Sequence, residues 1–256
     1  SVQPSEFLKP FFAVAIAWLF AVRQKLPYFP AYRASAAIYG FVVLLLLLQP
    51  DFGMTVTFSV IWGVQLFMAG LPFFWIILFI LLAALGAYLA YQFLPHVTER
   101  IDRFLDPSSG DNYQVEKSIE AFQNGGFIGR GPGEGVVKQF IPDSHTDFIF
   151  AVAGEEFGVL FCVVIVILFC SIIIKGLTRV WQQQDYFSML AVAGLLTQFG
   201  VQAFINMGVA LQMLPAKGMT LPFLSYGGSS IFAVSIAMGM VLALTRKRIS
   251  RSVPRE

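Results

Sequence analysis

Residues 148–174 read FIFAVAGEEFGVLFCVVIVILFCSIII, and this stretch decides the fold class. Its only charged residues are Glu155 and Glu156, and both lie near its start. About 20 apolar residues in a helix are enough to cross the hydrocarbon core of a bilayer. The stretch therefore predicts a transmembrane helix.

Six further apolar stretches flank this one, and each is bounded by proline, glycine or charge: 7–22, 35–49, 54–69, 71–93, 186–212 and 223–245. The whole chain is 57% hydrophobic and 12% charged, whereas soluble domains are about 25% charged. A net charge of +2 is too small to indicate a nucleic-acid partner. We therefore expect an all-α polytopic membrane protein. Stretches 35–49 and 54–69 are short, so they are either two crossings or one re-entrant pair.

Positive charge separates these alternatives, because short loops rich in Lys and Arg stay in the cytoplasm. Basic residues gather after the first stretch, after the fifth and in the tail: Arg23, Lys25, Arg33, Lys175, Arg179, Arg246, Lys247, Arg248, Arg251 and Arg255. They fall on one side only if both short stretches cross. The prediction is seven crossings, with four transmembrane helices in 1–93, a large extracytoplasmic loop in 94–147, three transmembrane helices in 148–245 and a basic cytoplasmic tail in 246–256. Because the chain begins with Ser1 rather than Met, we expect it to be a piece of a longer protein.

The loop 94–147 is acidic and rich in glycine between residues 125 and 135. Loops of this length in compact proteins are usually functional or disordered. Apolar residues recur along this one, namely Phe122, Phe127, Ile128, Val136 and Val137. We therefore expect the loop to pack onto the helices.

Asp147 stands where this loop meets the next helix, and its position has two interpretations. In the first, Ser144 or Thr146 caps the helix, and the negative charge of Asp147 in the first turn interacts favourably with the helix dipole. In the second, Asp147 is a catalytic base at the membrane surface, because loss of water raises the pKa of a carboxylate toward the working range of a base. Both roles are compatible.

The remaining acidic residues have structural interpretations as well as functional ones. Glu155 and Glu156 lie within an apolar helix, where a charge is costly and normally faces the bundle interior or a watery cavity. The structural interpretation is an ion pair or a protonated acid, and the functional one is contact with a substrate. The two glutamates point in different directions, so at most one shares the face of Asp147. Asp51 follows Pro50 between two short stretches, and a turn in which it bonds its own backbone explains it best.

Three residues are candidates for binding an anionic group. Glu6 and Lys9 are three apart and share one helical face. Either the two side chains pair with each other, or Glu6 holds a cation that binds a phosphate group. Lys217 lies beside Gly218 in a proline-flanked loop, which favours a fixed, aimed side chain over one that snorkels to the interface.

Polar residues at helical spacing mark the stretch 186–212. Gln198, Gln202 and Asn206 follow i, i+4, i+8 and form a stripe that in lipid joins helices by hydrogen bonds. Ser225 begins a run of small residues that continues to Ser230, which favours close helix packing and also leaves room for a lipid tail.

Several kinds of chemistry have no support in the sequence. Cys162 and Cys170 lie about 12 Å apart on one helix, too far to pair. Two histidines make a histidine-based metal site improbable. Neither a phosphate-binding loop nor a hydrolase nucleophile elbow is present. Any reaction should occur at the outer face, on a substrate that arrives already activated and lipid-borne.

Six blocks along the chain resemble the SEDS family (shape, elongation, division and sporulation), and the resemblance covers essentially the whole chain. Individually the glycine runs are weak signals, but the order of all six is specific. The blocks are Gln3–Glu6, Gln49–Gly53, Tyr113–Ser118, Gly125–Gly133, Pro142–Gly158 and Pro222–Ser230. The loop Leu214–Pro222, with Lys217, is similar to the cell-division member, since the elongation member usually carries apolar residues there.

The resemblance implies a ten-helix fold, of which this chain holds the fourth to tenth helices, with the large extracytoplasmic loop between the first four and the last three. It implies a peptidoglycan glycosyltransferase that polymerises lipid II for septal wall synthesis in the bacterial cytoplasmic membrane. The essential aspartate of the family falls on Asp147, as the base that deprotonates the acceptor sugar. No cofactor is required by the sequence.

Further expectations concern the substrate and the partners. Lys9, Lys217 or a divalent cation (Mg²⁺ or Mn²⁺) would neutralise the pyrophosphate leaving group, and Glu6, His145 and Ser225 complete the expected substrate-binding set. The expected partners are a class B penicillin-binding protein and other division membrane proteins. An elongation polymerase, a lipid II flippase and a scaffold that does no chemistry are the alternatives. A flippase needs a polar route to both faces, and the inner halves of these stretches offer few polar residues, which favours the enzyme.

Overall fold

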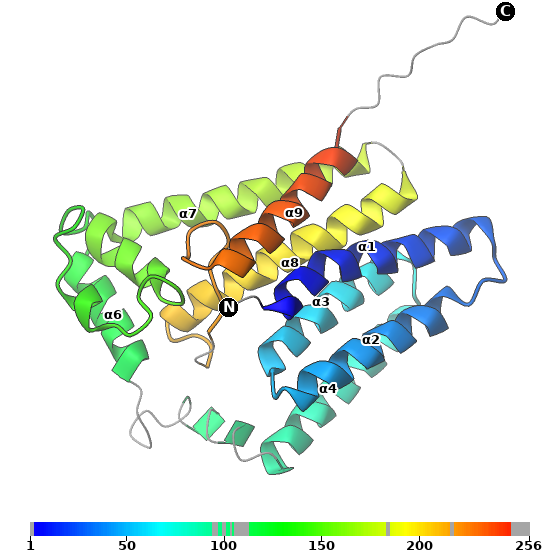
Figure 1. Ribbon diagram of the computed structural model, residues 1–256, viewed down its shortest axis with the longest axis horizontal. Coiled ribbons are helices and arrows are strands. Elements are labelled where there is room, and N and C mark those ends of the chain that lie inside the picture. The colour runs from blue at the N-terminus through cyan, green and yellow to red at the C-terminus, as the bar shows by residue number, and fades with distance from the viewer. Residues whose placement is uncertain are drawn as a thin grey trace, which may run out of the picture.

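The fold is a bundle of long apolar helices with a small helical lobe at one end (Figure 1). The computed structural model describes residues 3–93, 97, 98, 101, 102, 104, 113–182, 185–215 and 218–246, and it contains no strand within them. Its main helices are α1 (Pro4–Lys25), α2 (Ala31–Leu48), α3 (Phe52–Met68), α4 (Phe73–Phe93), α6 (Tyr113–Gly125), the short 3₁₀ helix η2 (Val137–Phe140), α7 (Ile149–Trp181), α8 (Tyr186–Ala210) and α9 (Gly228–Leu244). Each of the seven apolar stretches therefore holds one helix.

Five of the described helices are long and apolar enough to cross a membrane: α1, α2, α4, α7 and α8. The other two apolar helices, α3 and α9, have 17 residues each and are shorter than this. The chain is thus an all-helical, multi-pass membrane protein, and seven crossings stay a prediction. Of the predicted tail 246–256, only Arg246 lies among the described residues.

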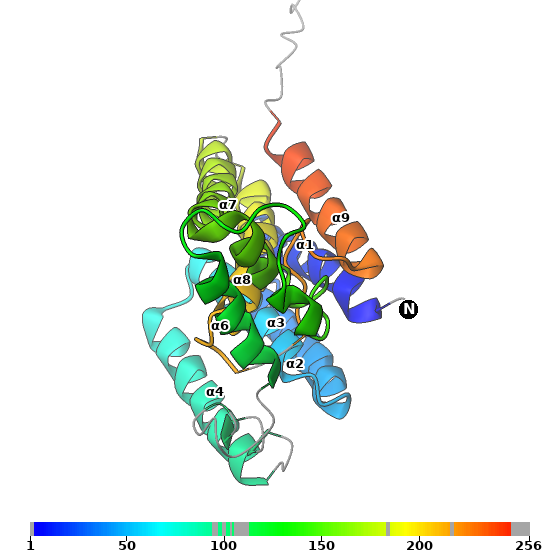
Figure 2. The same cartoon turned by 90° about the vertical axis from the view of Figure 1, so that its left-hand side faces the viewer.

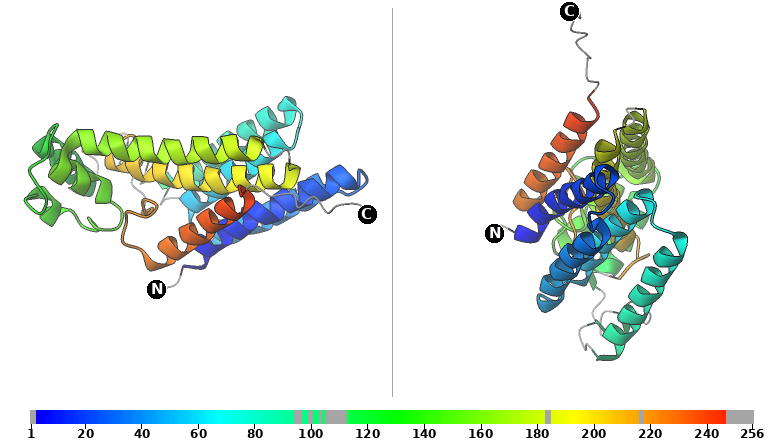
Figure 3. Two further views of the ribbon diagram at one scale, coloured as in Figure 1. Left: turned by 90° about the horizontal axis from the view of Figure 1, so that it is seen from above. Right: turned by 90° about the vertical axis from the view of Figure 1, so that its right-hand side faces the viewer.

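Helix α8 occupies the middle of the bundle and packs against α1, α3, α7 and α9 (Figures 1 and 3). Helix α4 stands at the periphery, where it packs against α3 and leaves most of its apolar side chains exposed (Figure 2). Apolar residues exposed all around a helix are expected where the surroundings are lipid.

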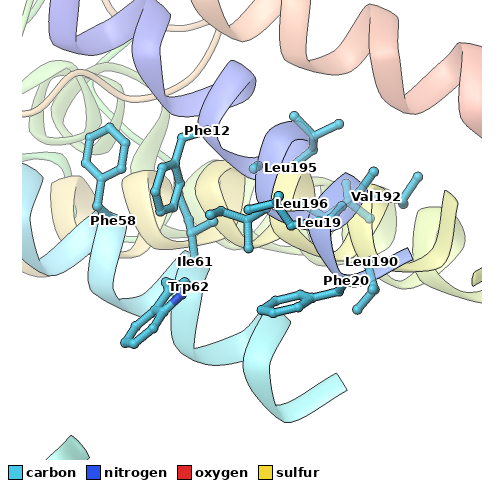
Figure 4. Close-up of a cluster of buried hydrophobic side chains, with 14 of the residues drawn as sticks. Phe12, Leu19, Phe20, Phe58, Ile61, Trp62, Leu190, Val192, Leu195 and Leu196 are labelled. Atoms are coloured by element: carbon cyan, nitrogen blue, oxygen red, sulfur yellow. The ribbon is translucent and has the colours of Figure 1, made fainter. Parts of the chain in front are cut away.

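Two clusters of buried apolar side chains form the interior. The first joins α1, α2, α3, α8 and α9, and Figure 4 shows part of it, with Phe12 from α1, Ile61 from α3 and Leu195 from α8. The amide of Gln65 crosses this cluster: its Nε2 donates to the carbonyls of Ala13, at 2.7 Å, and Leu190, at 3.1 Å. A Cβ atom at Gly194 would lie 2.6 Å from that nitrogen, so the glycine gives the amide its space.

The second cluster joins the loop to α7, α8 and α9. Ser118 Oγ in α6 donates to the carbonyl of Ala210 at 2.7 Å, which ties the loop to the end of α8. The prediction that the loop packs onto the helices is confirmed for Phe122 and Val137. It is wrong for Phe127, Ile128 and Val136, whose side chains are exposed.

Helix α7 is broken at Gly158, which has φ 80° and ψ 174°. The backbone of the glycine-rich segment occupies the break: the carbonyls of Gly126 and Phe127 accept from Val159 N and Leu160 N, and Arg130 N and Gly131 N donate to the carbonyls of Glu155 and Glu156. Backbone groups freed by a break at membrane depth must be bonded by protein. The glycine-rich segment supplies these bonds.

Replacing Gly158 by alanine should destabilise the protein by more than about 1 kcal/mol, because alanine is strained at positive φ. The added Cβ would also lie 2.3 Å from the carbonyl oxygen of Phe127, which is part of the break. The thermal unfolding midpoint of detergent-solubilised protein measures the effect. Gly63→Ala is the matched control, because a Cβ there meets nothing within 4 Å. Equal midpoints for the two variants would contradict the role given to Gly158.

Candidate functional site

Asp147 lies at the end of the loop, just before α7, and its side chain is partly buried. The helix begins at Ile149 with Phe148 as its N-cap, and no side chain caps it. Thr146 Oγ1 instead donates to the carbonyl of Asp143. The capping interpretation is therefore wrong. Among the described residues, none donates a hydrogen bond to the Asp147 carboxylate in the structure.

The surroundings of Asp147 raise its pKa above the usual range for aspartate. The larger cause is burial, which removes water from the carboxylate, and the smaller is the negative charge of Asp143. A carboxylate with a raised pKa and no hydrogen bond from the described part of the chain is well suited to accept a proton.

Asn206 holds the backbone of Asp147 in place and joins it to a second backbone segment. The Asn206 amide nitrogen donates to the carbonyl of Asp147 at 2.7 Å and to the carbonyl of Met219 at 2.6 Å. The segment on the other side of the carboxylate approaches closely, since a Cβ at Gly218 would lie 2.7 Å from Asp147 Oδ2. Asn206 therefore fixes the start of α7 and the segment after residue 217 relative to each other.

A second set of bonds ties the same two segments together. Ser225 Oγ donates to the carbonyl of Thr146 and accepts from Leu221 N at 2.7 Å. Tyr226 N donates to the carbonyl of His145 at 2.8 Å. His145, predicted to bind substrate, lies two residues before Asp147 and is exposed, whereas Ser225 is buried and bonds to the backbone.

Glu6 and Lys9 lie inside the bundle next to this site. Lys9 Nζ is 2.9 Å from Glu6 Oε2 and donates to Gln202 Oε1 at 2.8 Å, and the lysine is fully buried. The Gln202 amide nitrogen donates in turn to Thr220 and Ser230. The prediction of Lys9 as an open phosphate-binding cation is thus corrected: the ammonium is already bonded to protein, and it joins α1 to α8.

Asp51, treated in the sequence as a turn residue, is the N-cap of α3 and accepts from Met54 N at 3.1 Å. This confirms the local interpretation.

Glu155 anchors the loop to α7. Its buried carboxylate accepts four hydrogen bonds, from the amide of Asn124 and from the backbone nitrogens of residues 136–138, at 2.7–2.9 Å. A buried carboxylate is stable only when bonded in this way. The neighbouring Glu156 forms an ion pair with Lys138 that is partly exposed. Of the two interpretations for this pair of glutamates, the structure supports the structural one.

Lys217, the other predicted cation, lies outside the described residues. Residues that the sequence did not single out are Asp143, which acts on Asp147, and Thr220, which accepts from Gln202. No local pattern marks either. Within the described ranges no group of three His, Cys, Asp or Glu side chains is placed to hold a metal ion.

This geometry defines a class of protein: a helical membrane protein with a partly buried carboxylate and a buried polar network at one end of its bundle. The family model FTSW_RODA_SPOVE, described as "Cell cycle protein", matches residues 1–250. The chain belongs to this family, which is the SEDS family that the sequence resembles.

Relatives and solved structures agree with this membership. A protein of Caulobacter vibrioides described as a probable peptidoglycan glycosyltransferase FtsW is 45% identical over 97% of this chain and 64% of its own length. One from Saccharophagus degradans with the same description is 37% identical over 94% of this chain and 65% of its own length. The chain thus spans just under two thirds of these relatives.

Among solved structures, one concerns polymerization and crosslinking by a peptidoglycan synthase complex. Its matching chain has a TM-score of 0.78 and is 30% identical in sequence. The match covers 97% of this protein and 71% of the matching chain. The rod shape determining protein RodA of Thermus thermophilus gives 0.65 and 27%, over 97% of this chain and 67% of that one.

Replacing Glu155 by glutamine should lower the stability of the loop by about 1–3 kcal/mol, because the new amide group faces backbone donors and leaves at least one unbonded. Glu156→Gln is the matched control, and loss of a partly exposed ion pair should cost less than about 1 kcal/mol. The rate of protease cleavage within the loop, measured in detergent beside the unfolding midpoint, checks both. If the two variants are cleaved at the same rate, Glu155 does not anchor the loop.

Proposed function

We propose that this chain is the catalytic part of a peptidoglycan glycosyltransferase that polymerises lipid II into glycan strands, with Asp147 as general base. The support is its membership of the family and the descriptions of its FtsW relatives. The observation that carries the proposal is the Asp147 carboxylate, which is partly buried and accepts no hydrogen bond from the described residues.

In the proposed reaction, Asp147 removes the proton from the 4-hydroxyl of the acceptor sugar. The resulting oxygen nucleophile attacks the anomeric carbon of the donor, and the bond from that carbon to undecaprenyl pyrophosphate breaks. One displacement with inversion suffices, so a second catalytic carboxylate is not needed, unlike in the glycosidases. The products are a strand longer by one unit, a lipid pyrophosphate and a proton carried by Asp147.

The pyrophosphate leaving group develops negative charge that must be neutralised. Because Lys9 is bonded to Glu6 and Gln202, we assign this role to Lys217 or to a divalent cation that arrives with the substrate. His145 is exposed two residues before Asp147, and we assign it a contact with the sugar.

The proposal places the carboxylate outside the cytoplasm. Ten basic residues lie in the short loops and tail that seven crossings would put inside, in keeping with the positive-inside rule. The proposed partner is a class B penicillin-binding protein, and the likeness to a synthase complex that combines polymerization and crosslinking supports a partner of this kind. The proposed location at the division septum rests on the resemblance to the cell-division member of the family.

Asp147→Asn should leave the fold intact and abolish polymerisation, because an amide cannot accept the proton. The assay uses purified full-length protein with its transpeptidase partner and labelled lipid II in detergent, with products resolved on a gel. Asp143→Asn is the control, since it makes the same change four residues away and should keep activity. Near-normal strand extension by Asp147→Asn would refute the assignment of the base.

The same assay separates the alternatives. A flippase moves lipid II between two faces, and a detergent micelle has no faces. Polymer formed in detergent therefore cannot result from transport. A scaffold would leave the yield of polymer unchanged when Asp147 is replaced.

The rate of polymerisation should fall at acid pH as Asp147 becomes protonated, and its raised pKa places this fall above the usual aspartate range. Asp143→Asn removes a negative charge that raises the pKa, so the acid limb should move to lower pH. Asparagine also tolerates the φ of 55° at residue 143. Asp185→Asn is the matched control, because it makes the same change far from Asp147. Asp185 is the N-cap of α8 and lies 21 residues, or about 32 Å, from Asn206, which bonds to Asp147. An acid limb that stays in place in Asp143→Asn would contradict the electrostatic coupling.

A further inference from the structure

The tip of the glycine-rich loop carries two apolar side chains that no described part of the protein covers. Phe127 is 76% exposed and Ile128 is 81% exposed. Removing a side chain of this size from water is worth about 1.5–3 kcal/mol. Phe122 and Val137 of the same loop are packed against the protein. Exposure of two adjacent large apolar residues to water is unfavourable, so we expect an apolar environment around them.

The position of this tip along α7 is fixed by backbone bonds. The carbonyl of Phe127 accepts from Leu160 N at 3.3 Å, and the carbonyl of Gly126 accepts from Val159 N at 3.0 Å. Phe127 and Ile128 therefore sit level with the first turn of α7 after the break at Gly158.

The depth of that turn follows from the length of the helix. Leu160 lies 21 residues before Trp181, the last residue of α7, which is about 32 Å at 1.5 Å per residue. The apolar core of a bilayer is about 30 Å thick, and tryptophan favours its boundary. Counted instead from Lys175, the first charge toward that end, Leu160 is about 22 Å away and lies inside the core. Either way the tip is at or within the apolar edge.

The surroundings of the tip are continuous with the lipid-facing surface of α7. Leu160 is 61% exposed, and Ile167 and Leu168 further along the helix are similarly exposed. On the other side of the tip, Arg130 is exposed, and its Nε donates to the carbonyl of Asn124. An arginine next to apolar residues at this level is suited to lipid phosphates.

We propose that Phe127 and Ile128 insert among the acyl chains of the leaflet that α7 enters first, and that they anchor the glycine-rich loop to lipid. The inference does not depend on the proposed activity. The loop is then held by Glu155 on the side of the protein and by this apolar tip on the side of the membrane.

Nitroxide labels test the depth of the tip in the full-length protein, reconstituted into phosphatidylcholine–phosphatidylglycerol vesicles. Single cysteines are placed at Phe127→Cys and Ile128→Cys in a background of Cys162→Ala and Cys170→Ala. Accessibility is measured to oxygen, which concentrates in lipid, and to a polar nickel chelate, which stays in water. Glu134→Cys on the same loop is the aqueous control, and Leu168→Cys on α7 is the lipid control.

The expected result is a nickel accessibility severalfold below that of the Glu134→Cys label, with oxygen accessibility close to that of the Leu168→Cys label. Nickel accessibility equal to the aqueous control would overturn the proposal, because the tip would lie in water. Low accessibility to both reagents would also overturn it, since another protein segment would then cover the tip. All four positions are exposed, and unchanged unfolding midpoints establish that the labelled proteins are folded.

Discussion

A break in a helix frees backbone groups that must be bonded again wherever water is excluded, and the arrangement of this protein follows from how it meets that requirement. At Gly158 the chain leaves helical geometry, and four backbone hydrogen bonds to residues 126–131 replace those that the break removes. The glycine-rich segment must come very close to do this: a Cβ at Gly129 would lie 2.2 Å from the carbonyl oxygen of Glu156. Positive φ at residues 126, 129 and 131 allows the chain to bend around the helix end.

The loop that enters the break also brings Asp147 into position. After the glycine-rich segment, the chain continues through η2 to the start of α7. The Glu155 carboxylate fixes the beginning of η2. At the far end of this path, Asn206 and Ser225 bind the backbone around Asp147 from α8 and from the segment before α9. The carboxylate itself is left without a bonded donor among the described residues. The protein therefore holds the main chain firmly and keeps the acidic group available.

The sequence predicted the helices well and the polar contacts unevenly. Apolar content and breaks at proline, glycine and charge located all seven apolar helices, because those signals are local. Asp51 was also predicted, since its partner Met54 is three residues away. The pair of Glu6 and Lys9 was one of the two interpretations for these residues, and the structure shows it. The bond from Lys9 to Gln202 was not predicted, because these residues are 193 positions apart and no local pattern links them. The donors to Glu155 are mostly backbone nitrogens, which leave no mark on residue type.

The amide of Gln65, which bonds to α1 and α8 at once, links two positions that are distant in sequence. Its nitrogen occupies the space that a side chain at residue 194 would need. Any larger residue at 194 displaces the amide and removes its hydrogen bonds to the carbonyls of Ala13 and Leu190, whereas a shorter residue at 65 loses the same two bonds and leaves a void beside the glycine. The side chain that fits at residue 65 therefore depends on the absence of one at residue 194, so the two positions are sterically coupled although 129 residues separate them.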